Sequence, residues 1–379
     1  MPVESLPQDW DAIVVGAGIA GAMSALHLAR DNLRVLLVEK SEWPREKVCG
    51  GCLNAAALHA LADAGIQIAD GRGYAGMHLA CGLRRAQLPL PEGIAISRRQ
   101  LDALLVEHAI ATGAHFLPAT RASLGDAAPS MRDVVLRRGR RTHTVSTQIV
   151  LDCGGLASKL LPQADWRIAP GARIGVGAGI SDVPTWYRSD VVHMACAPHG
   201  YVGLVRAEDG IANVAAALDP AWCRTIGGPA QAIEAIFETC GFPAFKALRQ
   251  ARWRGTPQLT RRRRRLGAER VLVLGDAAGY VEPFTGEGMA WALADAAAIA
   301  PLARRAVADW NDNIVTHWSA QHARSVRTRQ RVCRGVSLLL RHTRLLAAAL
   351  PLIGSAPALV SPLSAWLNRD FHSAVMVDE

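Results

Sequence analysis

The stretch from Asp11 to Lys40 constrains the fold of this chain more than any other part of the sequence. An apolar, β-branched run at 12–15 is followed at once by three glycines in the spacing G-x-G-x-x-G, namely Gly16, Gly18 and Gly21. A helical pattern rich in Ala and Leu covers 22–29, and a second apolar run covers 34–38. This order predicts a strand, a tight turn, a helix and a parallel strand, which together form a βαβ unit.

The glycine spacing in this context indicates a dinucleotide site. Gly16 permits the sharp turn, Gly18 permits close approach of a pyrophosphate, and Gly21 permits the helix to lie against the strand. The free N–H groups at the start of the helix then face the phosphates. Glu39 ends the second strand, where its carboxylate can accept hydrogen bonds from a ribose, which favours FAD or NAD over NADP. The alternative is a doubly wound sheet with an empty turn.

Composition limits the partners and the compartment. With 379 residues, half of them hydrophobic, the chain is long enough for a large core. Its net charge of +9 is compatible with three classes of partner, namely nucleic acid, an anionic membrane or an acidic protein. The polar N-terminus does not read as a secretory signal, so we expect a cytoplasmic protein with no disulfides among its eight cysteines. The C-x-x-C pair Cys49 and Cys52 lacks the second pair that a zinc site needs, so no metal site is expected.

The pattern predicts a mixed α/β fold in which a Rossmann-like domain is interleaved with an antiparallel-sheet substrate domain and followed by C-terminal helices. The predicted parts of the nucleotide-binding domain are 1–75, 96–170 and 266–310, those of the substrate domain are 76–95 and 171–265, and the C-terminal helices are 311–379. Within these ranges we expect a hairpin at 132–151 and a long, arginine-rich helix at 311–344. The last apolar segment is interrupted by prolines, which favours packed helices with an apolar face over a membrane span. Weak membrane-surface contact of these C-terminal helices is the alternative.

Three further features allow two interpretations each. The run Arg261–Arg265 is interpreted as a solvated loop, or as a dock for an acidic carrier protein. Glu282 and Glu287 are interpreted as bases or as caps of the helix that follows them. His193 and His199 flank strands of the substrate sheet and are expected to be core or surface residues rather than acids.

Three turns in order carry a family resemblance. They are GAGIAG at 16–21 with Glu39, DCGGLAS at 152–158 and GDAAGYVEPFTGEGM at 275–289. Over most of residues 10–300 the chain resembles FAD-dependent oxidoreductases with the p-hydroxybenzoate hydroxylase fold. Within them it is most similar to geranylgeranyl reductases, on the grounds of KVCGG at 47–51, the segment 200–218 and the P-x-x-G-E-G-M ending.

The resemblance implies non-covalent FAD. It implies that Glu39 and the first glycines hold the ADP half, that Arg98 reaches the phosphates or ribityl chain, that Asp276 binds the ribityl hydroxyls, and that the segment 283–289 lies beside the flavin ring. The predicted cofactor-binding residues are Gly16, Gly18, Ala20, Gly21, Glu39, Lys40, Lys47, Cys49, Gly50, Gly51, Arg98, Asp152, Gly154, Gly275, Asp276, Pro283, Gly286, Glu287, Gly288 and Met289.

The DCGG turn is closer to the form found in flavin-dependent halogenases, but the W-x-W-x-I-P signature of those enzymes is absent. A halogenase-like enzyme is therefore an alternative, as is a non-catalytic flavin-binding or nucleic-acid-binding protein. The basic run has no interleaved aromatic residues and no nucleic-acid motif, so no nucleic-acid partner is expected.

Two chemistries fit a bound flavin. In one, reduced flavin reduces a carbon–carbon double bond while an acid protonates the other carbon, and Cys49 is the candidate catalytic residue because it matches the cysteine of the reductase motif. In the other, reduced flavin and oxygen hydroxylate the substrate. Electrons would come from NAD(P)H or from a partner reductase. Small and apolar residues in the substrate sheet predict a hydrophobic substrate, such as an aromatic, polyene or isoprenoid-like intermediate.

Overall fold

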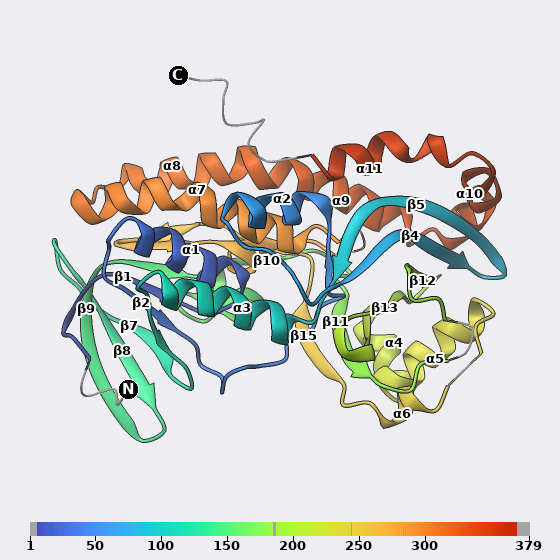
Figure 1. Ribbon diagram of the computed structural model, residues 1–379, viewed down its shortest axis with the longest axis horizontal. Helices are drawn as coiled ribbons and strands as arrows, with labels where there is room; N and C mark the ends of the chain where they lie inside the picture. Colours follow the sequence, from blue (N-terminus) through green and yellow to red (C-terminus); the bar gives the residue numbers. More distant parts are fainter. Residues whose placement is uncertain (1–5, 185–186, 244, 283, 285, 370–379) are drawn as a thin grey trace.

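The computed structural model describes residues 6–184, 187–243, 245–282, 284 and 286–369 (Figure 1). Its first sheet contains the predicted βαβ unit, and β1, β2, β6, β9 and β18 run parallel to one another in it. The strand order is β17 (Gly267–Ala268), β18 (Val271–Val273), β9 (Arg141–Asp152), β1 (Asp9–Val15), β2 (Val35–Val38) and β6 (His115–Leu117). The antiparallel strands β7 (Arg121–Ala127) and β8 (Arg132–Arg138) extend this sheet beyond β9, and the predicted hairpin at 132–151 is therefore confirmed.

The second sheet is mostly antiparallel. Its order is β15 (Arg254–Gln258), β11 (Ile174–Ile180), β14 (Ala212–Leu218), β13 (Gly200–Arg206), β12 (Val191–Ala197), β4 (Arg72–Cys81), β5 (Arg84–Ala95) and β3 (Cys52–Leu53). The chain enters this sheet twice, between β2 and α3 and again between β10 (Trp166–Ile168) and β17. The mixed α/β architecture predicted from the sequence is confirmed, although β3 and the start of β4 fall inside the range 1–75 that was assigned to the nucleotide-binding domain.

The helices near the first sheet are rich in alanine because they pack closely. α1 (Ile19–Arg30) contacts both α3 (Arg98–Ala111) and α7 (Gly288–Ala308), and ten of its twelve residues are buried. α2 (Ala55–Asp63) also contacts α7. On the far side of the second sheet lie α4 (Pro220–Thr225), α5 (Pro229–Thr239) and α6 (Ala247–Gln250) (Figure 1). A third, small sheet joins β10, β16 (Arg261–Arg263) and β19 (Gly279–Tyr280).

The C-terminal part is helical, as predicted, but the expected long helix at 311–344 is broken. α8 (Asn313–His322) passes through a π-helical turn at Ala323–Arg327 into α9 (Thr328–Leu339). The chain then bends by 102° into α10 (Thr343–Ser355), which is followed by α11 (Ser361–Leu367). Within the described ranges, no single helix has the length and apolar character needed to cross a membrane, and only the bent pair meets that test together.

Candidate functional site

A large cavity lies where the parallel strands of the first sheet end. Its volume is about 910 Å³, at the upper end of the range of roughly 300–1,000 Å³ for ligand sites. Its wall includes the end of β1, the start of α1, the loop at 39–52, part of β13 and β14, and the segment at 276–292. It therefore joins the nucleotide-binding turn to the face of the second sheet.

The glycine turn has the geometry that the sequence predicts. Gly16 has a φ of +104°, and a Cβ built on it would lie 2.5 Å from the carbonyl oxygen of Cys153. A Cβ on Gly21 would lie 1.8 Å from the carbonyl oxygen of Gly16, so the helix contacts the turn there directly. Gly18 is the N-cap of α1 and receives no side-chain cap, which leaves the first N–H groups of the helix facing the cavity.

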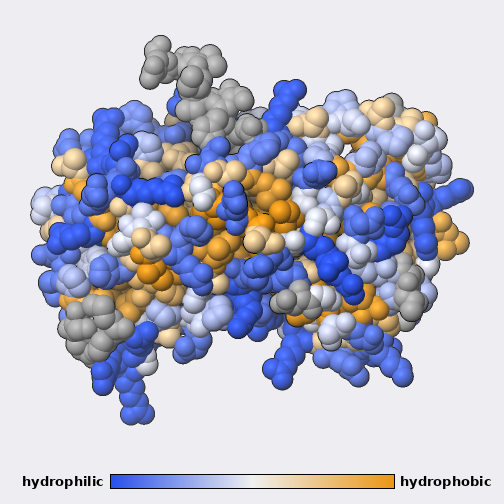
Figure 2. Space-filling view, viewed as in Figure 1, coloured by the Kyte–Doolittle hydropathy of each residue, from blue (hydrophilic) through white to orange (hydrophobic). Residues whose placement is uncertain are grey.

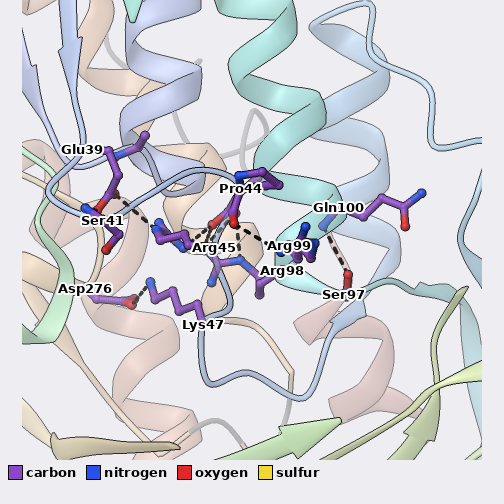
Figure 3. A network of polar contacts seen from close by, with 12 residues as sticks. Glu39, Ser41, Pro44, Arg45, Lys47, Ser97, Arg98, Arg99, Gln100 and Asp276 are labelled. Carbon is purple, nitrogen blue, oxygen red and sulfur yellow. Dashed lines mark hydrogen bonds and ion pairs between the residues drawn. The ribbon is translucent and has the colours of Figure 1, made fainter. Parts of the chain in front are cut away.

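Three cations converge on this helix start (Figure 3). A Cβ built on Gly18 would lie 3.4 Å from Arg98 Nη2, 3.5 Å from Arg45 Nη2 and 3.9 Å from Lys47 Nζ. Cations around uncapped N–H groups form a strong anion site. The charge and the space at Gly18 thus fit the diphosphate of a dinucleotide.

The carboxylate of Asp102 positions two of these cations. Arg98 donates Nε and Nη2 to it at 2.9 Å each, and Arg45 donates Nη1 at 2.9 Å. Burial is the largest single influence and would lower the pKa of Arg98, but Asp102, Cys49 and Asp276 together outweigh burial and raise it. Arg98 therefore stays charged although its side chain is only 6% exposed.

Glu39 lies at the end of β2 beside the turn. It accepts hydrogen bonds from the backbone N–H groups of Ala17 at 3.1 Å and Ser41 at 3.0 Å, and Arg45 Nε lies 3.2 Å from it. Burial acts to raise the pKa of this carboxyl, but Arg45 and the two N–H groups lower it below its ordinary value. Glu39 is thus held as an acceptor, as binding of ribose hydroxyls requires.

The middle of the cavity has an ion pair on one side and open space on another. Lys47 Nζ lies 3.2 Å from Asp276 Oδ2, so the ion pair spans from the loop at 39–52 to the segment after β18. Cys49, Gly50 and Gly51 line the cavity next to this pair. Gly286 has a φ of +75° and nothing within 4 Å of a built Cβ, which leaves space at the start of α7.

The structure brings fifteen of the predicted cofactor residues to the cavity wall. They are Gly16, Gly18, Ala20, Glu39, Lys40, Lys47, Cys49, Gly50, Gly51, Arg98, Gly154, Asp276, Gly286, Gly288 and Met289. Their roles in binding stay predictions. Pro283 lies outside the described residues.

Four predicted residues lie behind the wall instead. Gly21 supports helix packing, and Gly275 donates its N–H to Asp295 at 2.9 Å. Asp152 accepts from the N–H of Gly154 at 3.0 Å and from the hydroxyl of Ser158 at 2.7 Å, so it fixes the second turn, and burial raises its pKa. Glu287 is fully buried.

The structure corrects the interpretation of Glu282 and Glu287 as helix caps, whereas a role as bases stays a prediction. Glu287 occupies the N-cap position of α7, but its side chain accepts from no backbone N–H group there. It accepts a hydrogen bond from Trp291 Nε1 at 2.9 Å instead, and burial raises its pKa to about 7. Glu282 is also buried, and it pairs with Arg173 at 3.3 Å and Arg341 at 2.6 Å. It therefore links the second sheet to the end of α9 and does not cap a helix.

The expectation that the run Arg261–Arg265 is a solvated loop is wrong for its first half. These residues form β16, and the alternation of a strand buries Arg261 and Arg263 while it exposes Arg262. Arg263 donates to the carbonyl oxygens of Ala277 at 3.0 Å and Pro162 at 3.1 Å, and both buried guanidiniums lie over Trp166. Docking of an acidic carrier stays a prediction, for which the exposed residues are Arg262, Arg264 and Arg265.

The two histidines are not part of the cavity wall. His193 packs against His78 and Tyr187, and burial lowers its pKa to about 4. His199 stacks on Trp222 with ring centroids 5.0 Å apart. The expectation that neither acts as an acid agrees with these positions.

The far end of the cavity is apolar. Its wall there contains Tyr74, Met77, Leu90, Val192, Met194, Tyr201, Leu259 and Phe284. Tyr201 and Phe284 form an edge-to-face pair with centroids 5.3 Å apart. The Tyr201 hydroxyl is buried and finds no partner within the described part of the chain, and burial raises its pKa well above the ordinary value. Such an apolar wall with one free hydroxyl suits a hydrophobic ligand.

Sequence reasoning missed three side chains that the structure places in the candidate site or directly behind it. Arg45 carries no motif of its own, although its place between Glu39 and KVCGG was a signal. Tyr201 lies in a segment that was noted only as a resemblance. Asp295, which holds Gly275, lies inside the alanine-rich pattern of α7 and gave no signal.

Comparisons with known proteins agree with this geometry. The chain is 27% identical over 213 residues to menaquinone reductase of Mycobacterium tuberculosis, which covers 54% of this chain and 47% of that protein. The chain thus spans about half the length of this relative. It is 26% identical over 307 residues to digeranylgeranylglycerophospholipid reductase 2 of Methanothermobacter thermautotrophicus, covering 74% of each.

Among solved structures, the brominase Bmp2 superposes with a TM-score of 0.78 at 15% identity, over 95% of this chain and 93% of that one. p-Nitrophenol 4-monooxygenase PnpA of Pseudomonas putida gives 0.78 at 14% identity, over 96% and 99%. At such identities the likeness shows the fold alone. The model of the "FAD binding domain" family matches residues 9–305, and the chain therefore belongs to this family of flavin-dependent oxidoreductases and monooxygenases, with the p-hydroxybenzoate hydroxylase-like fold that its three turns predict.

Proposed function

We propose that this protein is an FAD-dependent reductase that saturates a carbon–carbon double bond in an elongated hydrophobic substrate of isoprenoid or polyene type. The observation that carries the proposal is the continuity of one cavity from the cationic glycine turn to the apolar wall, with the thiol of Cys49 on its surface. The names of the sequence relatives, which include two reductases of isoprenoid-bearing molecules, support this class of substrate.

FAD, when bound, supplies the two-electron redox chemistry of the reaction. The chain has to bind its diphosphate, which Arg45, Lys47 and Arg98 would do at the start of α1, and its ribose, for which Glu39 is the acceptor. Asp276 would accept a hydrogen bond from the ribityl chain in place of its contact with Lys47. The apolar wall would hold the olefin and exclude water.

Saturation of a double bond adds two hydrogens, one that arrives with the electron pair and one that arrives as a proton. Cys49 is the candidate donor of this proton, and its thiolate would regain a proton from solvent. Cys52 is a poor donor, because burial and then the neighbouring Cys49 raise its pKa to about 12. Both thiols are free, so neither is held in a disulfide. Oxygenation of the substrate would need no such acid.

The test is an anaerobic single-turnover experiment. Holoenzyme reduced chemically without oxygen is mixed with a polyprenyl olefin or with its saturated analogue, and the absorbance of oxidised flavin is followed. We expect reoxidation with the olefin only, together with a saturated product. Reoxidation that requires oxygen and yields a hydroxylated product would favour a monooxygenase, and a colourless protein that takes up no FAD would refute both.

The role of Cys49 has its own variants. Cys49→Ser should slow the anaerobic step by about 10²-fold or more, the usual effect of removing a general acid, while the FAD content stays unchanged. Cys223→Ala is the matched control, because Cys223 is a buried residue of α4 and is not part of the cavity wall. Equal rates for wild type and Cys49→Ser would remove Cys49 from the mechanism. NAD(P)H and a partner reductase both remain proposals for the electron donor.

A further inference from the structure

The C-terminal helices carry an unusual charge. From Asn313 to Asn368 the sequence contains no aspartate or glutamate and no lysine, but it contains seven arginines. This segment alone therefore has a formal charge of +7, out of +9 for the whole chain. Four of these arginines are exposed, namely Arg324, Arg331, Arg334 and Arg344. Such a surface repels a second copy of itself and attracts an anionic partner.

Exposed leucines lie on the same helices. Five of the nine strongly exposed large hydrophobic side chains in the described part of the molecule come from this segment: Leu338, Leu339, Leu345, Leu352 and Leu363, each between 40% and 62% exposed. Leu345 and Leu352 are seven residues apart, so they share one face of α10. In Figure 2 the end of the molecule over α10 and α11 is covered largely by weakly polar and hydrophobic residues.

The opposite face of α10 packs on the hydrophobic cluster that forms the apolar wall of the cavity, although α10 itself does not line the cavity. Leu346 and Leu350 are buried in one cluster with Tyr74, Met194 and Tyr201, three residues of the cavity wall. α10 packs against β4 and β5, which contribute Met77 and Leu90 to the same wall. One short helix thus separates the exposed leucines from the apolar part of the site.

We propose that the outer face of α9 and α10 is a docking surface for an anionic lipid membrane, which places the apolar end of the cavity next to the bilayer that dissolves its substrate. The part concerning substrate delivery rests on the proposed function, whereas the docking itself does not. Arginines near an anionic bilayer each strengthen binding about fivefold, and exposed leucines add apolar burial in the interface. An acidic protein would match the arginines but would leave the leucine face of α10 without a hydrophobic partner.

The experiment is flotation of the FAD-loaded protein with vesicles of phosphatidylcholine alone, or with about one-third phosphatidylglycerol. We expect flotation with the anionic vesicles, little with the neutral ones, and loss of binding at high salt. Leu345→Gln with Leu352→Gln, and Arg331→Gln with Arg334→Gln, should each weaken binding tenfold or more. These side chains are exposed, so the variants should keep their FAD content and melting temperature.

Matched controls come from other surfaces. Ile110→Gln with Ile211→Gln replaces two exposed apolar side chains on α3 and before β14, and Arg137→Gln with Arg140→Gln removes two exposed cations at the β8–β9 turn. Both pairs should bind vesicles like the wild type. The proposal is overturned if wild-type protein does not float, if test and control variants bind equally, or if the surface instead mediates self-association or binds only an acidic protein. Flotation requires no turnover, so failure of the reductase proposal would leave this result intact, and the converse also holds.

Discussion

Glu287 allows the sharpest test of the electrostatics behind the cavity. Its side chain is fully buried, Oε2 accepts from Trp291, and Oε1 has no partner among the described residues. Burial raises the pKa from an ordinary 4.5 to about 7, against the opposing pull of Arg329. A difference of about 2.5 pKa units corresponds to roughly 3 kcal/mol of stability that depends on pH.

The sign follows from linkage. Because the pKa in the folded protein lies above its value in the unfolded chain, the unfolded chain loses its proton first as the pH rises. The stabilisation from a neutral Glu287 is complete below about pH 4.5, decreases as the pH rises, and is lost above about pH 7. In Glu287→Gln the side chain is neutral at every pH, so this loss should disappear.

The assay is urea unfolding of apo-protein at about pH 5 and about pH 8, followed by tryptophan fluorescence. The free energy of unfolding of the wild type should decrease between these values by roughly 2–3 kcal/mol more than that of Glu287→Gln. Glu238→Gln, an exposed glutamate on α5, is the control and should follow the wild type. If the free energy of unfolding decreases with pH equally in wild type and Glu287→Gln, the reasoning is refuted, even if the two proteins differ by a constant amount.

Two pairs of variants test the glycine turn and its support. Gly18→Ala should fold but bind FAD at least tenfold more weakly, because its methyl group would lie against the guanidiniums of Arg98 and Arg45. Gly21→Ala should instead destabilise the fold itself, because its Cβ would meet the carbonyl oxygen of Gly16. Fluorescence titration with FAD and thermal melting separate the two effects, and equal behaviour of the two variants would contradict them. Asp295→Ala removes the acceptor for the N–H of Gly275 and should weaken FAD binding. Asp295→Asn keeps an acceptor oxygen and should restore much of the FAD affinity; if it does not, Asp295 has no such positioning role.

Much of the fold could be predicted from the sequence because local chemistry specifies it. A β-branched run, three spaced glycines and an alanine-rich helix have few alternative conformations, and the positive φ at Gly16 is one that glycine adopts most readily. Alternation of apolar residues likewise predicted the hairpin at 132–151. The break between α9 and α10 was not predicted, because the composition of 311–344 is helical throughout and the bend depends on packing against β4 and β5.

The candidate site was predicted in part for the same reason. Residues within motifs, such as Glu39 and Asp276, reach the cavity wall, whereas the sequence could not tell that Asp152 and Glu287 lie behind it. Their motifs specify a turn, but the direction of a side chain within a turn depends on partners such as Ser158 and Trp291. The buried arginines of β16 illustrate the same limit, since five identical residues carry no signal of which ones face Trp166.

The sequence alone therefore determined the nucleotide turn, the mixed α/β architecture and the family. Only the tertiary structure decided that Arg45, Lys47 and Arg98 converge on Gly18, and that α10 separates exposed leucines from the apolar wall. The physical reason is the separation along the sequence of the residues that interact. Backbone conformation and periodicity arise from neighbouring residues, whereas charge convergence, burial and pKa arise from residues far apart in the sequence that folding brings within a few ångströms.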